Sequence, residues 1–144
     1  MPVPDVRVRN FERKPIRQRD GTVAVGHVGD TRLYLVWNGA LRKMTSDHSP
    51  VGELEDLGEL SEAEAMAHPR RNEVFRDVGT QPRGPDDETF IEYKSFPFHS
   101  TAALLMASDG MSDALTSAEI GRIVETYAGD PGETAELLVE AANE

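Results

Sequence analysis

The dipeptide Asn38-Gly39 lies between two short segments in which apolar and polar residues alternate. Both residues tolerate a positive φ angle, which the type I′ turn of a two-residue hairpin requires. The alternation in residues 32–37 is typical of a half-buried strand, and residues 40–45 are expected to return beside it. Residues 22–29 are rich in β-branched side chains and are expected to form the preceding strand. The sequence therefore predicts a three-stranded meander.

Further strands and helices are expected along the rest of the chain. The expected strands are residues 73–78, 88–93 and 102–107, the last a continuous apolar run typical of a strand buried on both faces. The expected helices are residues 53–57, residues 62–67 behind a Ser61–Glu64 capping box, residues 118–127 capped by Ser117, and residues 131–142. Because hairpins dominate this order, the predicted fold class is α+β with mostly antiparallel sheets.

Composition narrows the classes of function. The chain carries 15 basic and 26 acidic residues, a net charge of −11, whereas contacts to nucleic acid or to an anionic membrane need clustered cations. Neither is therefore an expected partner. The absence of cysteine excludes disulfides, thiolate zinc sites and cysteine nucleophiles. No apolar run approaches the ~20 residues of a membrane span, and the first residues lack the apolar stretch of a signal peptide, so a cytoplasmic location fits best.

Charge divides the chain into a basic extension, residues 1–21, and one acidic domain, residues 22–144. The first 20 residues hold six basic and three acidic side chains. Such a segment could bind an acidic partner or nucleic acid, but we favour a solvated extension or an edge strand. The alternation in residues 6–9 would suit a half-buried strand.

Aspartates stand where strands are expected to end. Asp30 lies in the turn between two strands, and Asp109 follows the most apolar strand, with Asp113 shortly after it. Carboxylates gathered at strand ends suit hard cations such as Mg²⁺ or Mn²⁺. These residues also have an explanation without a metal: Asp30 could form a turn, and Asp109 could be a loop or helix-capping residue. Taken alone, the residues favour those structural roles.

Several segments, in order along the chain, resemble one enzyme family. Residues 27–35 read HVGDTRLYL, residues 44–49 read MTSDHS, residues 68–72 read HPRRN and residues 104–113 read LLMASDGMSD. The first and last are similar to the HVGDSR and LLCSDGL segments of the metal-dependent protein phosphatase 2C family, the PPM-type phosphatases. The resemblance covers about residues 22–143, and several ordered segments are more specific than any single motif.

This resemblance implies a fold and a chemistry. The fold would be an α-β-β-α sandwich of mostly antiparallel sheets flanked by helices, here a partial one. The chemistry would be hydrolysis of phosphoserine or phosphothreonine in a phosphoprotein substrate, by a water that Mn²⁺ or Mg²⁺ ions activate. By position, Asp109 matches a ligand of a catalytic metal. Asp30 and Asp113 match acidic residues that hold a further, weaker metal together with Asp109.

Two segments of the family have no counterpart in residues 1–144. One is an N-terminal Asp-Gly-Met-Gly-Gly segment that holds both catalytic metals, and the other is a C-terminal Asp-Asn segment whose aspartate completes the site. Asp109 is thus the one core ligand that is matched, and we expect a partial domain with weak Mn²⁺ binding and little turnover. The alternatives are a catalytically silent regulatory or binding module with this fold, and a small acidic domain in which cation binding is incidental.

Other side chains with chemical potential have structural explanations as well. Arg70 and Arg71 could contact a substrate phosphate, although we favour a structural role for their loop. For His27 and His48 we favour packing or hydrogen bonding over metal ligation. The sequence leaves the phosphoprotein and the oligomeric state open.

Overall fold

The computed structural model describes residues 7–9, 21–79, 81–84, 87, 89–127 and 129–144. Its strands are β1 (Arg7–Arg9), β2 (Gly21–His27), β3 (Arg32–Trp37), β4 (Ala40–Lys43), β5 (Glu92–Phe98) and β6 (Ala103–Ala107). Its helices are α1 (Pro50–Asp56), α2 (Glu62–Met66), α3 (Asp109–Ser112), α4 (Ser117–Glu125) and α5 (Pro131–Asn143). The described strands form a four-stranded sheet in the order β1-β6-β3-β4 and a two-stranded sheet of β2 and β5. Every described pair is antiparallel, which confirms the predicted α+β class.

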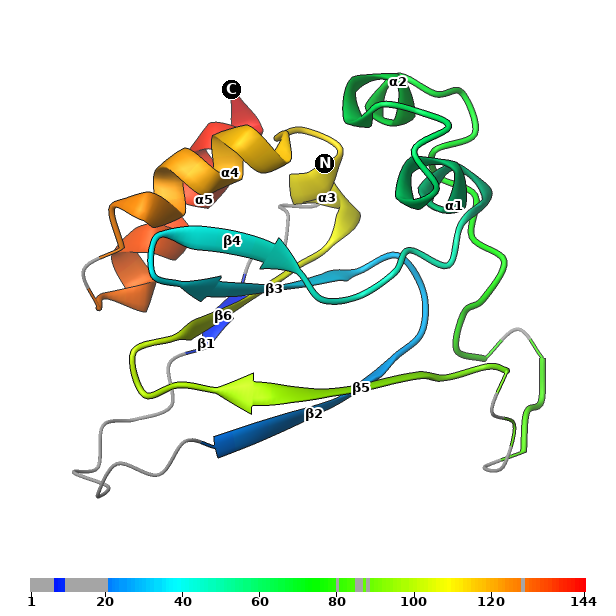
Figure 1. The fold of residues 1–144 in the computed structure, drawn as a ribbon. Coiled ribbons are helices and arrows are strands. Elements are labelled where there is room, and N and C mark those ends of the chain that lie inside the picture. The colour runs from blue at the N-terminus through cyan, green and yellow to red at the C-terminus, as the bar shows by residue number, and fades with distance from the viewer. Residues whose placement is uncertain (1–6, 10–20, 80, 85–86, 88, 128) are drawn as a thin grey trace.

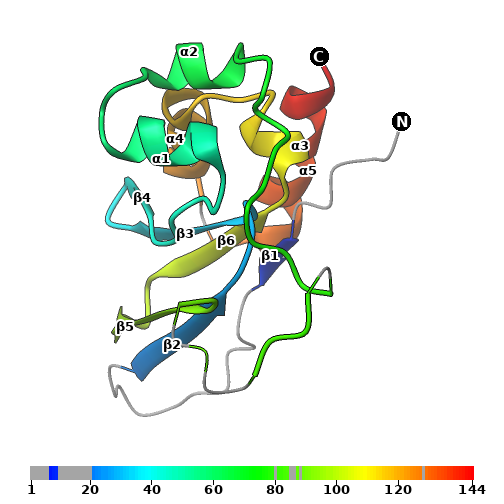
Figure 2. The same cartoon turned by 90° about the vertical axis from the view of Figure 1, so that its right-hand side faces the viewer.

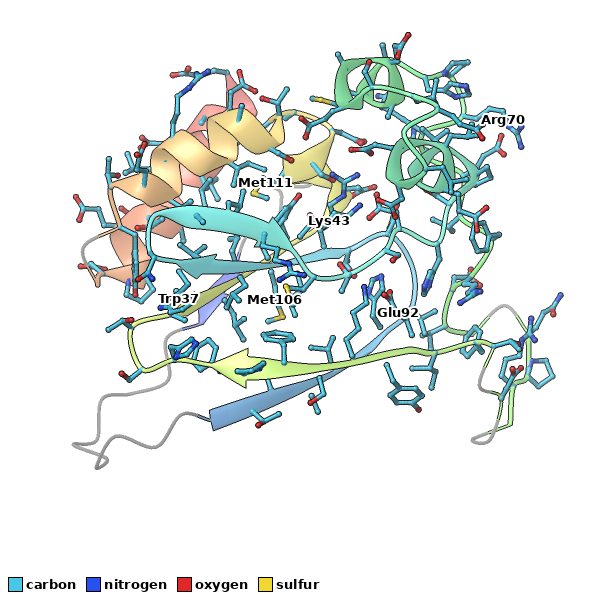
Figure 3. The ribbon with its side chains drawn as sticks, viewed as in Figure 1. Trp37, Lys43, Arg70, Glu92, Met106 and Met111 are labelled. Carbon is cyan, nitrogen blue, oxygen red and sulfur yellow. The ribbon has the colours of Figure 1, made fainter. Side chains whose placement is uncertain are left out.

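The two sheets and the C-terminal helices form layers. Helices α4 and α5 cover one face of the four-stranded sheet, and the β2–β5 sheet lies on its other side (Figure 1). Figure 2 shows the same order after a quarter turn. The main core fills the layer between the larger sheet and the helices, where Met111 is fully buried. Figure 3 shows Met111 in this layer, whereas Met106 lies on the sheet face toward β2 and β5.

The hairpin at Asn38-Gly39 is present as predicted. Asn38 has a φ of 51° and Gly39 a φ of 73°, and Trp37 pairs with Ala40 directly across the turn. Both positive angles match the turn that follows the right-handed twist of the strands. The returning strand ends at Lys43, earlier than expected, and the hydroxyl of Thr45 then accepts a hydrogen bond from the Leu33 backbone N–H.

The predicted meander is wrong in its first strand. Strand β2 lies in the β2–β5 sheet, paired with β5 from Gly21↔Phe98 to His27↔Glu92, and does not pair with β3. The turn at Gly29, which has a φ of 106°, carries the chain from one sheet to the other. Alternation along a strand reports its two faces but not its neighbour, so the pattern could not identify this partner.

Two further strand predictions are wrong: one strand is absent and the other begins later in the chain. Residues 73–79, all of which the structure describes, form no strand, and Val78 is 84% exposed there. The strand expected at residues 88–93 begins instead at Glu92 and continues to Phe98. Strand β6 is present, but its burial on both faces is not complete, because Met106 is 42% exposed while Leu105 is buried. The β2–β5 sheet thus covers this face of β6 only in part.

The helices agree with the sequence more closely than the strands do. The capping box of Ser61 and Glu64 opens α2 as predicted. The cap of α4 is Thr116, in a capping box with Glu119, and not Ser117. Both the backbone N–H and the hydroxyl of Ser117 donate instead to the Glu62 carboxylate, which links α4 to α2. The short helix α3 was not predicted.

The basic N-terminal segment is described only at residues 7–9. There its backbone forms the edge strand β1, paired with β6 so that Val8 lies opposite Leu105. This agrees with the edge-strand interpretation that the sequence favoured. Residues 1–6 and 10–20 lie outside the described residues, so the boundary at residue 21 stays a prediction.

Candidate metal centre

The three aspartates singled out in the sequence line one cavity. Asp30 lies in the turn between β2 and β3, Asp109 is the first residue of α3, and Asp113 caps the C-terminal end of that helix. The cavity between them measures about 30 Å³. Since a water needs ~10–15 Å³, this space can hold a cation or two to three waters.

The register of the sheet explains why Asp30 and Asp109 meet. Arg32, the first residue of β3, lies opposite Ala107, the last residue of β6. Asp30 stands just before this pair and Asp109 just after it, so antiparallel pairing brings both carboxylates to the same edge. Helix α3 adds the third carboxylate, because the N–H of Asp113 donates to the carbonyl of Asp109, 2.7 Å away, one helical turn later.

Burial and mutual repulsion act on these carboxylates together. Burial raises the pKa of the Asp30 carboxyl above its ordinary value, and the charge of Asp109 raises it further. Burial also raises the pKa of Asp113; the Arg71 guanidinium opposes this shift, and Asp109 adds to it. Asp30 and Asp113 are partly buried and Asp109 is exposed. Carboxylates that repel one another gain from a nearby positive charge. All three offer oxygen atoms, the donor that Mg²⁺ and Mn²⁺ prefer, so the chemistry of the donors suits such a cation. Their ligand atoms are not among those that the described residues bring within 4.8 Å of one another, so a role as metal ligands stays a prediction.

The two arginines predicted to meet a phosphate differ in position. Arg71 lines the cavity, and its Nε lies 3.5 Å from an Oδ of Asp113. Arg70 is not among the described residues that line the cavity, and its guanidinium pairs with Glu73 at 2.7 Å. Figure 3 shows Arg70 on the outer side of the loop that follows α2. A role of either arginine in substrate binding stays a prediction.

A buried ion pair in the cavity wall was not singled out from the sequence. The Arg32 guanidinium donates to both carboxylate oxygens of Asp47, and Glu55 accepts a further bond from it at 3.1 Å. Burial alone would lower the pKa of Arg32, but the bonds to Asp47 outweigh it and raise the pKa. Gly52 packs closely against Asp47 in this wall. A Cβ on Gly52 would stand only 2.4 Å from the Cβ of Asp47, so there is no room for a side chain at this position.

Among the described residues, the cluster of possible metal ligands whose atoms lie within 4.8 Å of one another comprises His27, His48 and Glu92. The Nε2 of His27 donates to the carbonyl of Ser46 at 3.0 Å, and the Nδ1 of His48 accepts from the Gly29 N–H at 3.1 Å. With Nδ1 accepting, the proton of a neutral His48 lies on Nε2, which is 3.6 Å from Glu92. Burial, followed by the neighbouring His27, lowers the pKa of His48. Both histidines thus form hydrogen bonds, as the sequence led us to expect, and the preference for this role over metal ligation stays a prediction.

Comparison with known proteins gives this geometry a context. No family model matches the chain. The serine/threonine phosphatase Stp of Listeria welshimeri is 37% identical over 121 residues, covering 84% of this chain and 46% of the relative. The protein phosphatase PhpP of Streptococcus pneumoniae is 35% identical over 124 residues, covering 86% of this chain and 48% of the relative. The chain therefore spans about half the length of the relatives it matches.

Solved structures agree in fold. The PPM Ser-Thr phosphatase MsPP of Mycobacterium smegmatis matches with a TM-score of 0.64 and 32% identity, covering 83% of this chain and 49% of that one. The serine/threonine phosphatase of S. agalactiae matches with a TM-score of 0.68 and 29% identity, covering 85% of this chain and 48% of that one. The chain is part of a PPM-type phosphatase domain. In this phosphatase fold, the cavity lined by the three aspartates joins residues from all four segments quoted for the sequence resemblance: 27–35, 44–49, 68–72 and 104–113.

Proposed function

We propose that the protein is a metal-dependent serine/threonine phosphatase and that residues 1–144 supply part of its metal centre. The observation that carries this proposal is the meeting of Asp30, Asp109 and Asp113 at one small cavity. The phosphatase relatives, each matched over about half its length, support the choice of reaction. The substrate would be a protein that carries phosphoserine or phosphothreonine.

The cofactor would be a divalent cation, Mn²⁺ or Mg²⁺. Such a cation, when bound, lowers the pKa of a water and neutralises phosphoryl oxygens. The carboxylates of Asp30, Asp109 and Asp113 would hold it, and the buried Arg32–Asp47 pair would keep the cavity wall in place. The catalytic domain of PstP, which shares the fold with a TM-score of 0.66, was solved in complex with 2 manganese ions.

A protein nucleophile is not needed in this proposal. The chain has no cysteine. Ser108, which directly precedes Asp109, lines a different cavity, on the β2 side of the sheet. The phosphate would thus be attacked by water, without a covalent intermediate on the chain.

Among the described residues, no helix is long and apolar enough to cross a bilayer. We propose a cytoplasmic site of action.

The expected activity of residues 1–144 alone is low. Attack by a water held between two cations needs ligands for both ions, and Asp109 is the one core ligand that the sequence matches. We therefore expect Mn²⁺-dependent hydrolysis of p-nitrophenyl phosphate little above background. Robust turnover that Asp109→Asn abolishes would mean that residues 1–21 or a second copy of the chain complete the site.

The phosphatase function itself is tested in the coding sequence that flanks residues 1–144. The proposal expects the Asp-Gly-Met-Gly-Gly and Asp-Asn segments there, and Mn²⁺-dependent hydrolysis of a phosphothreonine peptide by the joined protein. Asp109→Asn should reduce that turnover at least 100-fold, roughly the loss of one strong transition-state interaction. Absence of both segments, together with no turnover, would favour the catalytically silent module instead.

A further inference from the structure

Arg71 places a positive charge at an oxygen of the proposed cation site. It belongs to the loop that follows α2, and its Nε lies 3.5 Å from the Asp113 carboxylate on α3. Its side chain is 41% exposed and that of Asp113 is 32% exposed, so the contact lies at the open side of the cavity. The loop after α2 and helix α3, which are far apart in the sequence, thus meet at the Asp113 carboxylate.

The guanidinium and a divalent cation cannot share Asp113 freely. A divalent cation binds a carboxylate oxygen directly, at about 2.0–2.6 Å. A guanidinium, which is always charged and can only donate hydrogen bonds, needs the same carboxylate oxygens as acceptors. Both are positive, and at the separation that a shared carboxylate imposes they repel each other.

We propose that Arg71 is an internal counter-ion of Asp113 that competes with the divalent cation and is released when the cation binds. This inference rests on the proposed function, because the cation is the one that the three aspartates would hold. Release would free a guanidinium at the cavity, where its paired donors suit the bidentate recognition of a phosphate. Cation binding would then prepare Arg71 for the phosphate-binding role that the sequence suggested.

Beyond Arg71, the loop is joined to the rest of the described residues near Phe75, whose ring lies 6.2 Å from that of His48. Residues 69–75 are all exposed. The backbone bond that joins the described part of this loop to the sheet side is Phe75 N–H to the carbonyl of His48, at 3.0 Å. Loss of the Arg71–Asp113 contact should therefore loosen residues 69–75, which gives the proposal a conformational readout.

Arg70 is a matched control. It is the same residue type in the same loop, but it pairs with Glu73 and does not contribute to the described lining of the cavity. A general effect of removing one positive charge from the loop would be similar for the two arginines. A competition for Asp113 would appear for Arg71 alone.

The experiment is a calorimetric titration of MnCl₂ into the wild-type chain and its Arg71→Met, Arg71→Lys and Arg70→Met variants. Removing a competing ion pair of this exposure should tighten Mn²⁺ binding by roughly threefold to fivefold in Arg71→Met. Arg70→Met and the charge-retaining Arg71→Lys should stay within about twofold of wild type. Hydrogen exchange of residues 69–75 should become faster when MgCl₂ is added to the wild type, and should be fast without it in Arg71→Met.

Two results would overturn the inference. Equal or weaker Mn²⁺ binding by Arg71→Met, with the wild type binding normally, would contradict competition while leaving the proposed metal site intact. Absence of Mn²⁺ binding in all four proteins would contradict the metal site itself and this inference with it. Far-UV circular dichroism shows whether Arg71→Met is folded, and Arg71→Gln is the replacement if it is not.

Discussion

Arg32 and Asp47 form a bidentate ion pair in the wall of the cavity that the three aspartates share. Their side chains are 10% and 6% exposed, so both charges are largely out of water. Arg32 begins β3, next to the turn of Asp30, and Asp47 precedes α1. The pair therefore fixes the turn that carries one proposed ligand against the segment that leads into the helices.

Breaking this pair should cost much of the stability of the domain. Arg32→Met leaves Asp47 buried without its main partner, and we expect the free energy of unfolding to fall by about 3–5 kcal/mol. Urea denaturation checks this value. Arg83→Met, which removes the more exposed pair with Asp87, should cost much less. Equal losses for the two variants would contradict the importance of the buried pair.

Two helical glycines should respond to alanine in opposite ways. A Cβ on Gly52 would stand 2.4 Å from the Cβ of Asp47, so Gly52→Ala should destabilise the domain by about 1–3 kcal/mol and disturb the cavity wall. Gly121 in α4 has no atom within 4 Å of such a Cβ. Gly121→Ala should therefore stabilise by roughly 0.5–1 kcal/mol, through helix propensity. Thermal unfolding of the two variants compares them; a loss of stability in both would contradict this packing.

The effect of Mn²⁺ should depend on pH because protons compete for the same carboxylates. The folded-state pKa values of Asp30 and Asp113 are raised above 3.8, so the folded state binds these protons more tightly than the unfolded state does. Without metal, their contribution to stability is full below pH 3.8 and is lost as pH rises through the raised values. Cation binding needs the deprotonated forms and has the opposite trend. The increase in melting temperature on adding Mn²⁺ should thus shrink as pH falls from neutral toward the raised pKa values of Asp30 and Asp113.

The control for this pH dependence is a variant with both Asp30→Asn and Asp113→Asn. Its melting temperature should show little response to Mn²⁺ at any pH between neutral and about 5. A wild-type response that stays constant down to pH 4 would contradict the raised pKa values.

Local signals in the sequence were enough for the parts of the fold that depend on near neighbours. Asn38-Gly39 specifies its own turn, and Ser61 with Glu64 specifies the start of α2, since the interacting groups lie within a few residues. The partner of β2 was not predictable in this way. Its pairing with β5 joins residues far apart in the chain, and the alternation in β2 is equally compatible with a strand in either sheet.

The candidate site shows the same division. The sequence shows that Asp30 and Asp109 stand at the ends of strands. It does not show that they line one cavity, because that depends on the register that sets Arg32 opposite Ala107. The Arg71–Asp113 and Arg32–Asp47 contacts join separate elements, and no spacing in the sequence encodes them. Only the resemblance to a known family placed the aspartates together before the structure did.

The most direct test of the account is the change in melting temperature that millimolar Mn²⁺ causes in three proteins: the wild-type chain, Asp109→Asn and Asp87→Asn. Asp109 lines the cavity with the other two aspartates, whereas Asp87 belongs to a surface pair with Arg83. A ligand that binds the folded state alone stabilises it in proportion to its occupancy, so Mn²⁺ should raise the melting temperature of the wild type and of Asp87→Asn modestly and equally. Asp109→Asn should lose this increase. No increase in the wild type, or the same increase in Asp109→Asn, would contradict a metal centre at Asp30, Asp109 and Asp113.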